Sequence, residues 1–108
     1  MKRTKTGKMH KFGDVILTEV FYHDKNSKKL RPALILYQEE GNVIIAGITS
    51  NKSRPGIELT KKEGAIKESI IRTNYIFTIS KSMIRKKLFS ISNNKKEIVK
   101  NEIIKRMS

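Results

Sequence analysis

The chain has 108 residues, 37% of them hydrophobic and 31% charged, so it can close one hydrophobic core but not two. Lys and Arg outnumber Asp and Glu by 24 to 10, and the resulting net charge of +14 favours nucleic acid as a partner. The alternative is that much of this charge is ordinary solvated surface. Cysteine is absent, which excludes disulfides and thiolate chemistry. No apolar run approaches the roughly 20 residues of a membrane span, and none follows the basic N-terminus as in an export signal, so we expect a cytoplasmic protein without membrane contact.

The first segments in chain order are a tail, a strand and a loop. Residues 1–11 contain five basic side chains and little that can be buried, so we expect a flexible basic tail before a single domain at residues 12–108. GDVILTEVFY, which begins at Gly13, is rich in β-branched and aromatic residues and predicts a strand. HDKNSKK, at residues 23–29, predicts a polar loop.

The next two apolar runs, LRPALILY at residues 30–37 and NVIIAGITS at residues 42–50, predict an antiparallel hairpin with its turn in QEEG. A turn centred near Glu40 pairs Tyr37 with Val43, Ala33 with Gly47 and Arg31 with Thr49. Directly opposed residues bring their Cβ atoms to roughly 5 Å, so this register predicts that the Arg31 guanidinium and the Thr49 hydroxyl share one end of the hairpin.

The remainder predicts short strands and a terminal helix. NKSRPG marks a turn, IELT a short strand, and ESIIRTNYIF a strand with Arg72 and Asn74 on one face. ISKSMIRKKLFSI fits a one-turn helix near residues 80–83 and a strand at 87–91. Residues 92–94 supply helix N-cap side chains, and one face of the helix that follows carries Val99, Ile103, Ile104 and Met107. The predicted fold is mainly β, a small, strongly bent antiparallel barrel with a C-terminal helix.

No Gly-rich phosphate loop, HExxH helix, GxSxG elbow or acidic metal motif occurs in the chain, so we expect no metal and no cofactor. Polar side chains instead gather at predicted strand ends, where they can bind a phosphodiester. RNA needs no metal for cleavage, because its own 2′-OH attacks the adjacent phosphorus and the protein supplies acid, base and positive charge. Arginine suits the last task, since its planar fork makes two hydrogen bonds to phosphate. By themselves, Arg31 and Arg72 are also compatible with ordinary edge-strand arginines.

Four blocks of this sequence, GDVILTEVFY, LRPALIL, NVIIAGITSN and SIIRTNYIFTISKSMIRKKL, are similar to successive blocks of the MazF/PemK family, in the family's order, across residues 12–107. The resemblance implies the toxin of a type II toxin-antitoxin pair, a homodimer with the SH3-like barrel of MazF and CcdB. It implies an endoribonuclease of the mRNA interferase type that cleaves single-stranded RNA without metal. It also implies an acidic antitoxin, whose partly disordered tail suits the positive charge of this chain.

The resemblance also suggests site residues. Arg31 and Thr49 match the family's active-site arginine and threonine, and we expect them to be catalytic. Arg72 and Asn74 match an arginine and an acidic residue, but the Asn74 amide cannot take a proton, which puts that role in doubt and leaves the general base unidentified. The expected RNA contacts come from the loops beside the predicted strands and from this last pair: His23, Lys25, Lys28, Lys29, Ser50, Asn51, Lys52, Arg54, Arg72 and Asn74.

Two other functions stay open at this point. The related CcdB toxins inhibit DNA gyrase through a C-terminal contact rather than by cutting RNA, whereas this chain ends in the basic KNEIIKRMS. A non-catalytic SH3-like binder of nucleic acid, DNA included, is favoured if Asn74 reflects lost activity. Three Tyr and four Phe offer few stacking platforms for that role.

Overall fold

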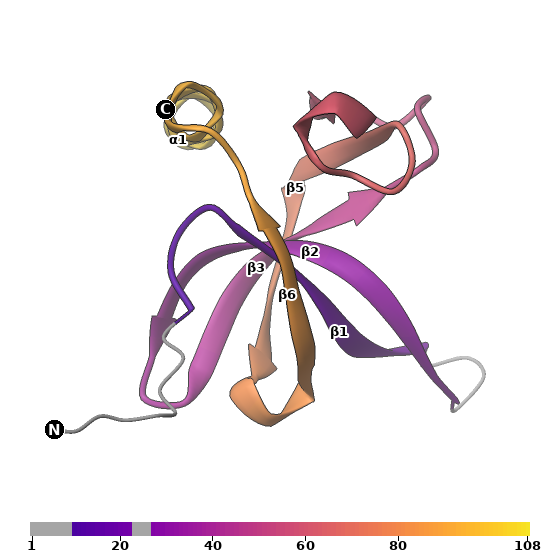
Figure 1. Cartoon of the computed structure of the whole chain (residues 1–108). Coiled ribbons are helices and arrows are strands. Elements are labelled where there is room, and N and C mark those ends of the chain that lie inside the picture. The colour runs from indigo at the N-terminus through magenta and orange to yellow at the C-terminus, as the bar shows by residue number, and fades with distance from the viewer. Residues whose placement is uncertain (1–9, 23–26) are drawn as a thin grey trace, which may run out of the picture.

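A computed structural model describes residues 10–22 and 27–108 and shows a mainly antiparallel fold with one C-terminal helix (Figure 1). Six strands form one sheet in the order β4-β5-β3-β2-β1-β6. The bounds of the strands are β1 Asp14–Tyr22, β2 Ser27–Glu39, β3 Asn42–Thr49, β4 Ile57–Leu59, β5 Ser69–Ser80 and β6 Ile84–Ser90. Two 3₁₀ turns, η1 Lys61–Glu63 and η2 Lys81–Met83, precede β5 and β6, and the helix α1 spans Asn93–Met107. Residues 1–9 of the predicted tail lie outside the described residues.

The predicted hairpin is formed by β2 and β3. Glu40 and Gly41 both have positive φ, 50° and 84°, which is what a two-residue hairpin turn requires. Ala33 pairs with Gly47 as predicted, but Tyr37 pairs with Ile44 rather than with Val43, so that part of the predicted register is wrong. The reason is a bulge between Ile35 and Tyr37, which adds one residue to β2.

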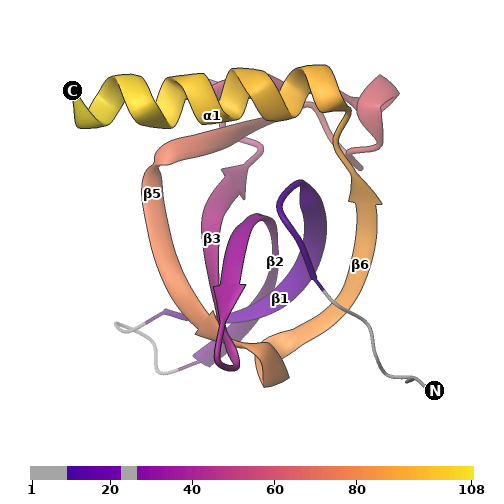
Figure 2. The same ribbon diagram turned by 90° about the vertical axis from the view of Figure 1, so that its left-hand side faces the viewer.

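The sheet curves into a half-barrel, and α1 lies across one end of it (Figure 2). Register shifts interrupt the ladders of β1 with β6, β2 with β3 and β3 with β5, and such bulges bend the strands that carry them. The predicted one-turn helix and strand correspond to η2 and β6, although β6 begins at Ile84, earlier than predicted.

Both faces of the central strands are buried. Leu34 belongs to a core cluster that reaches Val99 of α1, whereas its neighbour Ile35 belongs to a second cluster that includes Ile79 of β5. Successive strand residues point to opposite faces, so the unbroken apolar runs of β2 and β3 supply both clusters. Each fully buried Leu or Ile side chain contributes about 1.5–3 kcal/mol.

The helix α1 begins as predicted, since the Ser92 hydroxyl accepts a hydrogen bond from the Lys95 N–H at 3.1 Å. Val99 is fully buried and Ile103 packs on the core, but Ile104 and Met107 are 58% and 75% exposed. Of the four side chains on the predicted apolar face, the first two pack on the core and the last two are exposed. No helix among the described residues is long and apolar enough to cross a membrane.

Candidate nucleic-acid site

Arg31 and Thr49 lie where the β2–β3 ladder stops. Its last pair is Ala33 with Gly47, so the predicted pairing of Arg31 with Thr49 is not formed. Beyond that point Arg31 pairs with Thr18 of β1, while Thr49 pairs with Ile70 of β5. Pro32, which has no N–H to donate, stands next to this end of the ladder. The structure brings the predicted pair to the wall between two neighbouring cavities, because Arg31 and Thr49 line both of them.

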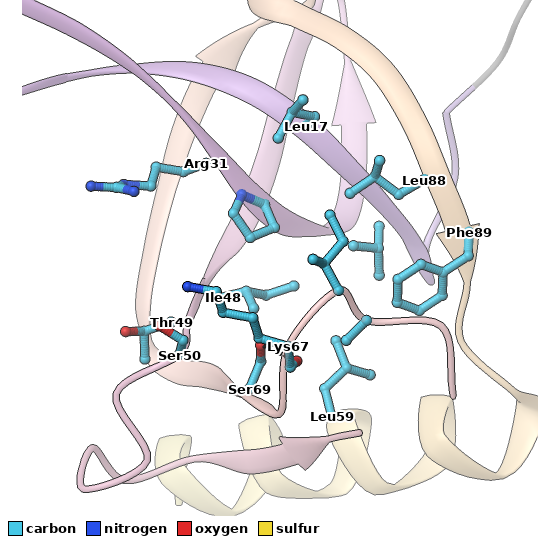
Figure 3. A pocket seen from close by; sticks show the side chains of 14 residues that line it. Leu17, Arg31, Ile48, Thr49, Ser50, Leu59, Lys67, Ser69, Leu88 and Phe89 are labelled. Carbon is cyan, nitrogen blue, oxygen red and sulfur yellow. Dashed lines mark hydrogen bonds between the residues drawn. The ribbon is translucent and has the colours of Figure 1, made fainter. Parts of the chain in front are cut away.

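The first cavity has a volume of about 430 Å³ and is mostly apolar, with Leu59, Leu88 and Phe89 among its lining residues. Polar groups stand at one side of it. In Figure 3 the Arg31 guanidinium, the Lys67 ammonium and the Thr49 hydroxyl all point to that side. We call this space the apolar cavity. It combines an apolar interior with charge at its edge, a combination that suits an organic anion.

The second cavity, of about 690 Å³, contains a second arginine and two aromatic rings. The guanidinium carbon of Arg72 lies 4.7 Å from the centroid of the Tyr75 ring, and the Tyr75 and Phe77 centroids are 5.1 Å apart. The Arg72 Nε atom is buried and has no hydrogen-bond partner among the described residues. We call this space the arginine-tyrosine cavity.

A bulge of three residues in β5 determines which side chains line this cavity. Ala46 pairs with Ile76 and the next residue, Gly47, pairs with Arg72, so residues 73–75 stand between two adjacent pairs. The regular alternation that predicted one face for Arg72 and Asn74 is interrupted there. Arg72 lines the cavity, whereas Asn74 is exposed and lines neither cavity. The structure therefore does not bring Asn74 to the Arg31 and Thr49 pair.

The loop after β3 is built on its own polar side chains. The Thr49 Oγ1 atom accepts a hydrogen bond from the Asn51 N–H at 3.1 Å, and the Asn51 amide oxygen accepts from the Ser53 N–H and hydroxyl. Ser50 lines the apolar cavity, while Asn51, Lys52 and Arg54 are exposed on the loop and line neither cavity. Of these four predicted RNA contacts, Ser50 therefore lies in the site and the other three lie on the loop beside it.

The other four predicted contacts come from the predicted loop at residues 23–29, but β2 already begins at Ser27, so the loop prediction is wrong for its last three residues. His23 and Lys25 lie outside the described residues. Lys28 and Lys29 are exposed on β2, and the Lys28 ammonium lies 3.4 Å from the Glu19 carboxylate, which offsets part of its charge. Neither of these lysines lines the two cavities.

Three cavity side chains, Lys67, Tyr75 and Phe77, have no counterpart in the sequence-based prediction. Tyr75 and Arg72 are three residues apart, which in a regular strand means opposite faces, and no local pattern reveals the bulge that unites them. Lys67 lies in the polar segment before β5, where basic residues are frequent. Among the described residues that line the cavities, none is acidic or a histidine, and no cluster of metal-ligating side chains occurs in the described part.

Comparisons with known proteins identify the family and the fold of this chain. A family model described as PemK-like, MazF-like toxin of type II toxin-antitoxin system matches residues 11–107. No curated protein sequence gives a significant match. Among 37 matching chains of solved structures is the Mycobacterium tuberculosis toxin MazF-mt6, with 20% identity, a TM-score of 0.63, and coverage of 84% of this chain and 93% of that chain. At this identity the likeness shows the fold alone, and that fold is the MazF-like half-barrel with its C-terminal helix.

Proposed function

Since the chain belongs to the family of PemK-like, MazF-like toxins of type II toxin-antitoxin systems, we propose that it is an endoribonuclease that cleaves single-stranded RNA without a metal ion. Membership of this family implies an antitoxin as its partner. We propose that residues 12–108 form the toxin domain and residues 1–11 a basic tail. The antitoxin is acidic in this proposal, because a chain with a net charge of +14 attracts a negatively charged partner.

One observation carries the proposal: Arg31 and Thr49 line both cavities at the point where β2 and β3 part, and basic side chains lie on either side of them. Lys67 lines the apolar cavity and Arg72 the arginine-tyrosine cavity. A phosphodiester held at the shared wall meets positive charge from both directions. Such charge stabilises the phosphate oxygens as they become more negative in the transition state.

The proposed reaction is an internal transfer within the RNA. The 2′-oxygen bonds to the adjacent phosphorus, the bond from phosphorus to the 5′-oxygen breaks, and one proton moves from the 2′-oxygen to the 5′-oxygen. The products are a 2′,3′-cyclic phosphate and a 5′-hydroxyl, and no water is consumed. The substrate is single-stranded because splayed nucleotides can adopt the in-line geometry that this attack requires.

In this reaction Arg31 stabilises the transition state, since its guanidinium makes two parallel hydrogen bonds to phosphate oxygens. Thr49 positions the phosphate through its hydroxyl proton. Lys67 and Arg72 draw in the neighbouring phosphates, with the exposed Lys52 and Arg54 of the loop after β3 as further contacts. The active form is a homodimer in this proposal, as is typical of the family.

The test is incubation of the purified protein with a long single-stranded RNA in EDTA, with the ends mapped by primer extension. We expect discrete cuts that leave 5′-hydroxyl ends, and we expect Arg31→Ala to abolish them while Arg31→Lys retains a small fraction. Arg85→Ala is the matched control, because it removes the same charge from an exposed side chain on β6 outside both cavities.

Each contrary result has a defined meaning. Cuts that need an added divalent ion contradict the metal-free reaction. Intact RNA with tight binding favours a non-catalytic nucleic-acid binder. Intact RNA together with inhibition of DNA gyrase favours a poison that acts on a protein, as CcdB toxins do.

A further inference from the structure

We propose that Arg72, Tyr75 and Phe77 form a stacking platform that holds one nucleobase of the RNA beside the scissile phosphate. The inference rests on the proposed function and deepens it, because it assigns a base-binding role to side chains of the arginine-tyrosine cavity. Tyr75 is the residue that contacts the base.

The three side chains form a continuous stack. The Arg72 guanidinium lies against the Tyr75 ring with 4.7 Å between the guanidinium carbon and the centroid, and Phe77 contacts the same ring in a tilted arrangement at 5.1 Å. These contacts hold the ring in place, yet Tyr75 is 50% exposed. An aromatic ring that is anchored on one side and open on the other can receive a second planar group.

Gly47 provides the space in which this ring sits. A Cβ atom at this position would lie 2.7 Å from the Tyr75 Cδ2 atom, closer than van der Waals contact permits. The ring therefore packs directly over the β3 backbone, two residues before Thr49 on the same strand. The platform and the proposed phosphate site thus belong to one wall of one cavity.

One polar atom of the Arg72 side chain, Nε, is buried without an acceptor in the described part of the chain. A buried N–H that lacks an acceptor destabilises the protein, and no hydrogen-bond partner for this atom exists among the described residues. The volume of about 690 Å³ lies in the range of sites that hold ligands of nucleotide size.

A nucleobase fits this surface better than a peptide. Sites that bind single-stranded nucleic acid typically combine arginines with exposed aromatic rings, because the bases stack on the rings and the phosphates pair with the cations. Arg31 and Arg72 both line the cavity that contains the ring, so one nucleotide can occupy the ring and an arginine together. Stacking accepts any base, so the platform contributes affinity and position rather than strict sequence choice.

The test uses oligonucleotides of about eight nucleotides with deoxyribose throughout, which cannot be cut because they lack the 2′-OH, and binding is measured by fluorescence anisotropy. One probe carries thymine at every position and the other is abasic with the same charge. We expect Tyr75→Leu to weaken binding of the thymine probe about tenfold and to leave binding of the abasic probe unchanged. Tyr75→Phe keeps the wild-type affinity because it keeps the ring.

Tyr37→Leu is the matched control, since Tyr37 is 55% exposed on β2 and lines neither cavity. A second measurement uses the wild-type protein and does not depend on the folding of a variant. A probe containing 5-iodouracil is irradiated in the complex, and the crosslinked peptide is identified by mass spectrometry. We expect the crosslink at Tyr75 or Phe77.

The outcomes separate this inference from the proposed function. If Arg31→Ala abolishes RNA cleavage but Tyr75→Leu binds both probes as the wild type does, the platform is refuted and the nuclease stands. If no RNA is cut and no probe binds, both proposals fail. If Tyr75→Leu loses affinity for an acidic peptide but not for the thymine probe, the surface serves a protein partner and the base-binding role is wrong.

Discussion

At the residue scale, the Thr49 hydroxyl has two hydrogen-bonding capacities. Its oxygen accepts the Asn51 N–H at 3.1 Å, which ties the loop after β3 to the strand end. A hydroxyl that accepts in this way still has its own proton to donate. Since Thr49 lines both cavities, a phosphate oxygen held at their shared wall is the acceptor that our proposal assigns to this proton.

Replacement of Thr49 by Val removes the hydroxyl while nearly preserving the shape of the side chain. We expect Thr49→Val to lower the single-turnover cleavage rate by about 100-fold, the effect of losing one preorganised donor to a developing oxyanion. Thr49→Ser keeps the donor and is expected to stay within about fivefold of the wild type. An unchanged rate in Thr49→Val, with an unchanged melting temperature, contradicts the positioning role.

At the scale of elements, α1 holds the segment that borders the apolar cavity. The Lys95 ammonium donates to the Glu58 carbonyl at 2.7 Å and lies 3.1 Å from the Glu63 carboxylate. Glu63 in turn accepts from the Thr60 N–H at 2.8 Å in the capping box of η1. Lys67 follows on the same segment, so these contacts stabilise the stretch of chain that presents it.

The Glu63 carboxyl provides a pH-dependent test of this tie. Burial raises its pKa, but the hydrogen bond from the Thr60 N–H and the contacts with Lys95 and the Thr60 hydroxyl lower it by more, so that its pKa lies below the ordinary value of 4.5. A carboxyl with a lowered pKa in the folded state stabilises the fold above its unfolded pKa and loses that contribution as the pH falls through the folded pKa.

We therefore expect Glu63→Gln to reduce the free energy of unfolding by about 1 kcal/mol at neutral pH. The difference from the wild type should shrink as the pH falls below 4.5, the ordinary pKa of a glutamate, which urea denaturation at a series of pH values will measure. Glu97→Gln serves as the control, because Glu97 forms an exposed ion pair with Lys100, and both residues lie on α1. A Glu63→Gln deficit that stays constant with pH excludes the ion pair as its cause.

At the scale of the whole molecule, the net charge of +14 predicts strongly salt-dependent binding of nucleic acid. Release of counterions from a single strand gives a slope of about −0.7 per neutralised phosphate in a plot of log affinity against log salt concentration. With Arg31, Lys67, Arg72 and one loop cation in contact, the expected slope is about −3.

Anisotropy titrations of the uncleavable thymine probe across a range of salt concentrations will measure this slope. We expect Arg72→Met to make it shallower by about 0.7. Lys105→Met removes the same charge from the exposed last turn of α1 and is expected to leave the slope unchanged. Equal slopes in both variants place the binding surface elsewhere on the molecule.

Local patterns were sufficient for much of the fold. The hairpin, the short strand at residues 57–59, the turn near residue 81 and the capped terminal helix all follow from β-branched runs, turn residues and an N-cap, which are signals within a few positions of each other. The pairing of Ala33 with Gly47 also followed from the hairpin register. The family was predictable for the same reason, because its blocks are short and keep their order, and the match to residues 11–107 confirms it.

The sequence by itself thus determined the β-rich fold, its terminal helix, the strong positive charge and the presence of Arg31 and Thr49 at one end of a hairpin. Only the tertiary structure decided which other side chains join them. The bulge at residues 73–75 brings Arg72 and Tyr75 to one cavity and leaves Asn74 outside it, and folding of the segment before β5 brings in Lys67. Bulges depend on how a strand meets its partners across the sheet, and that long-range fit leaves no periodic signal in the chain.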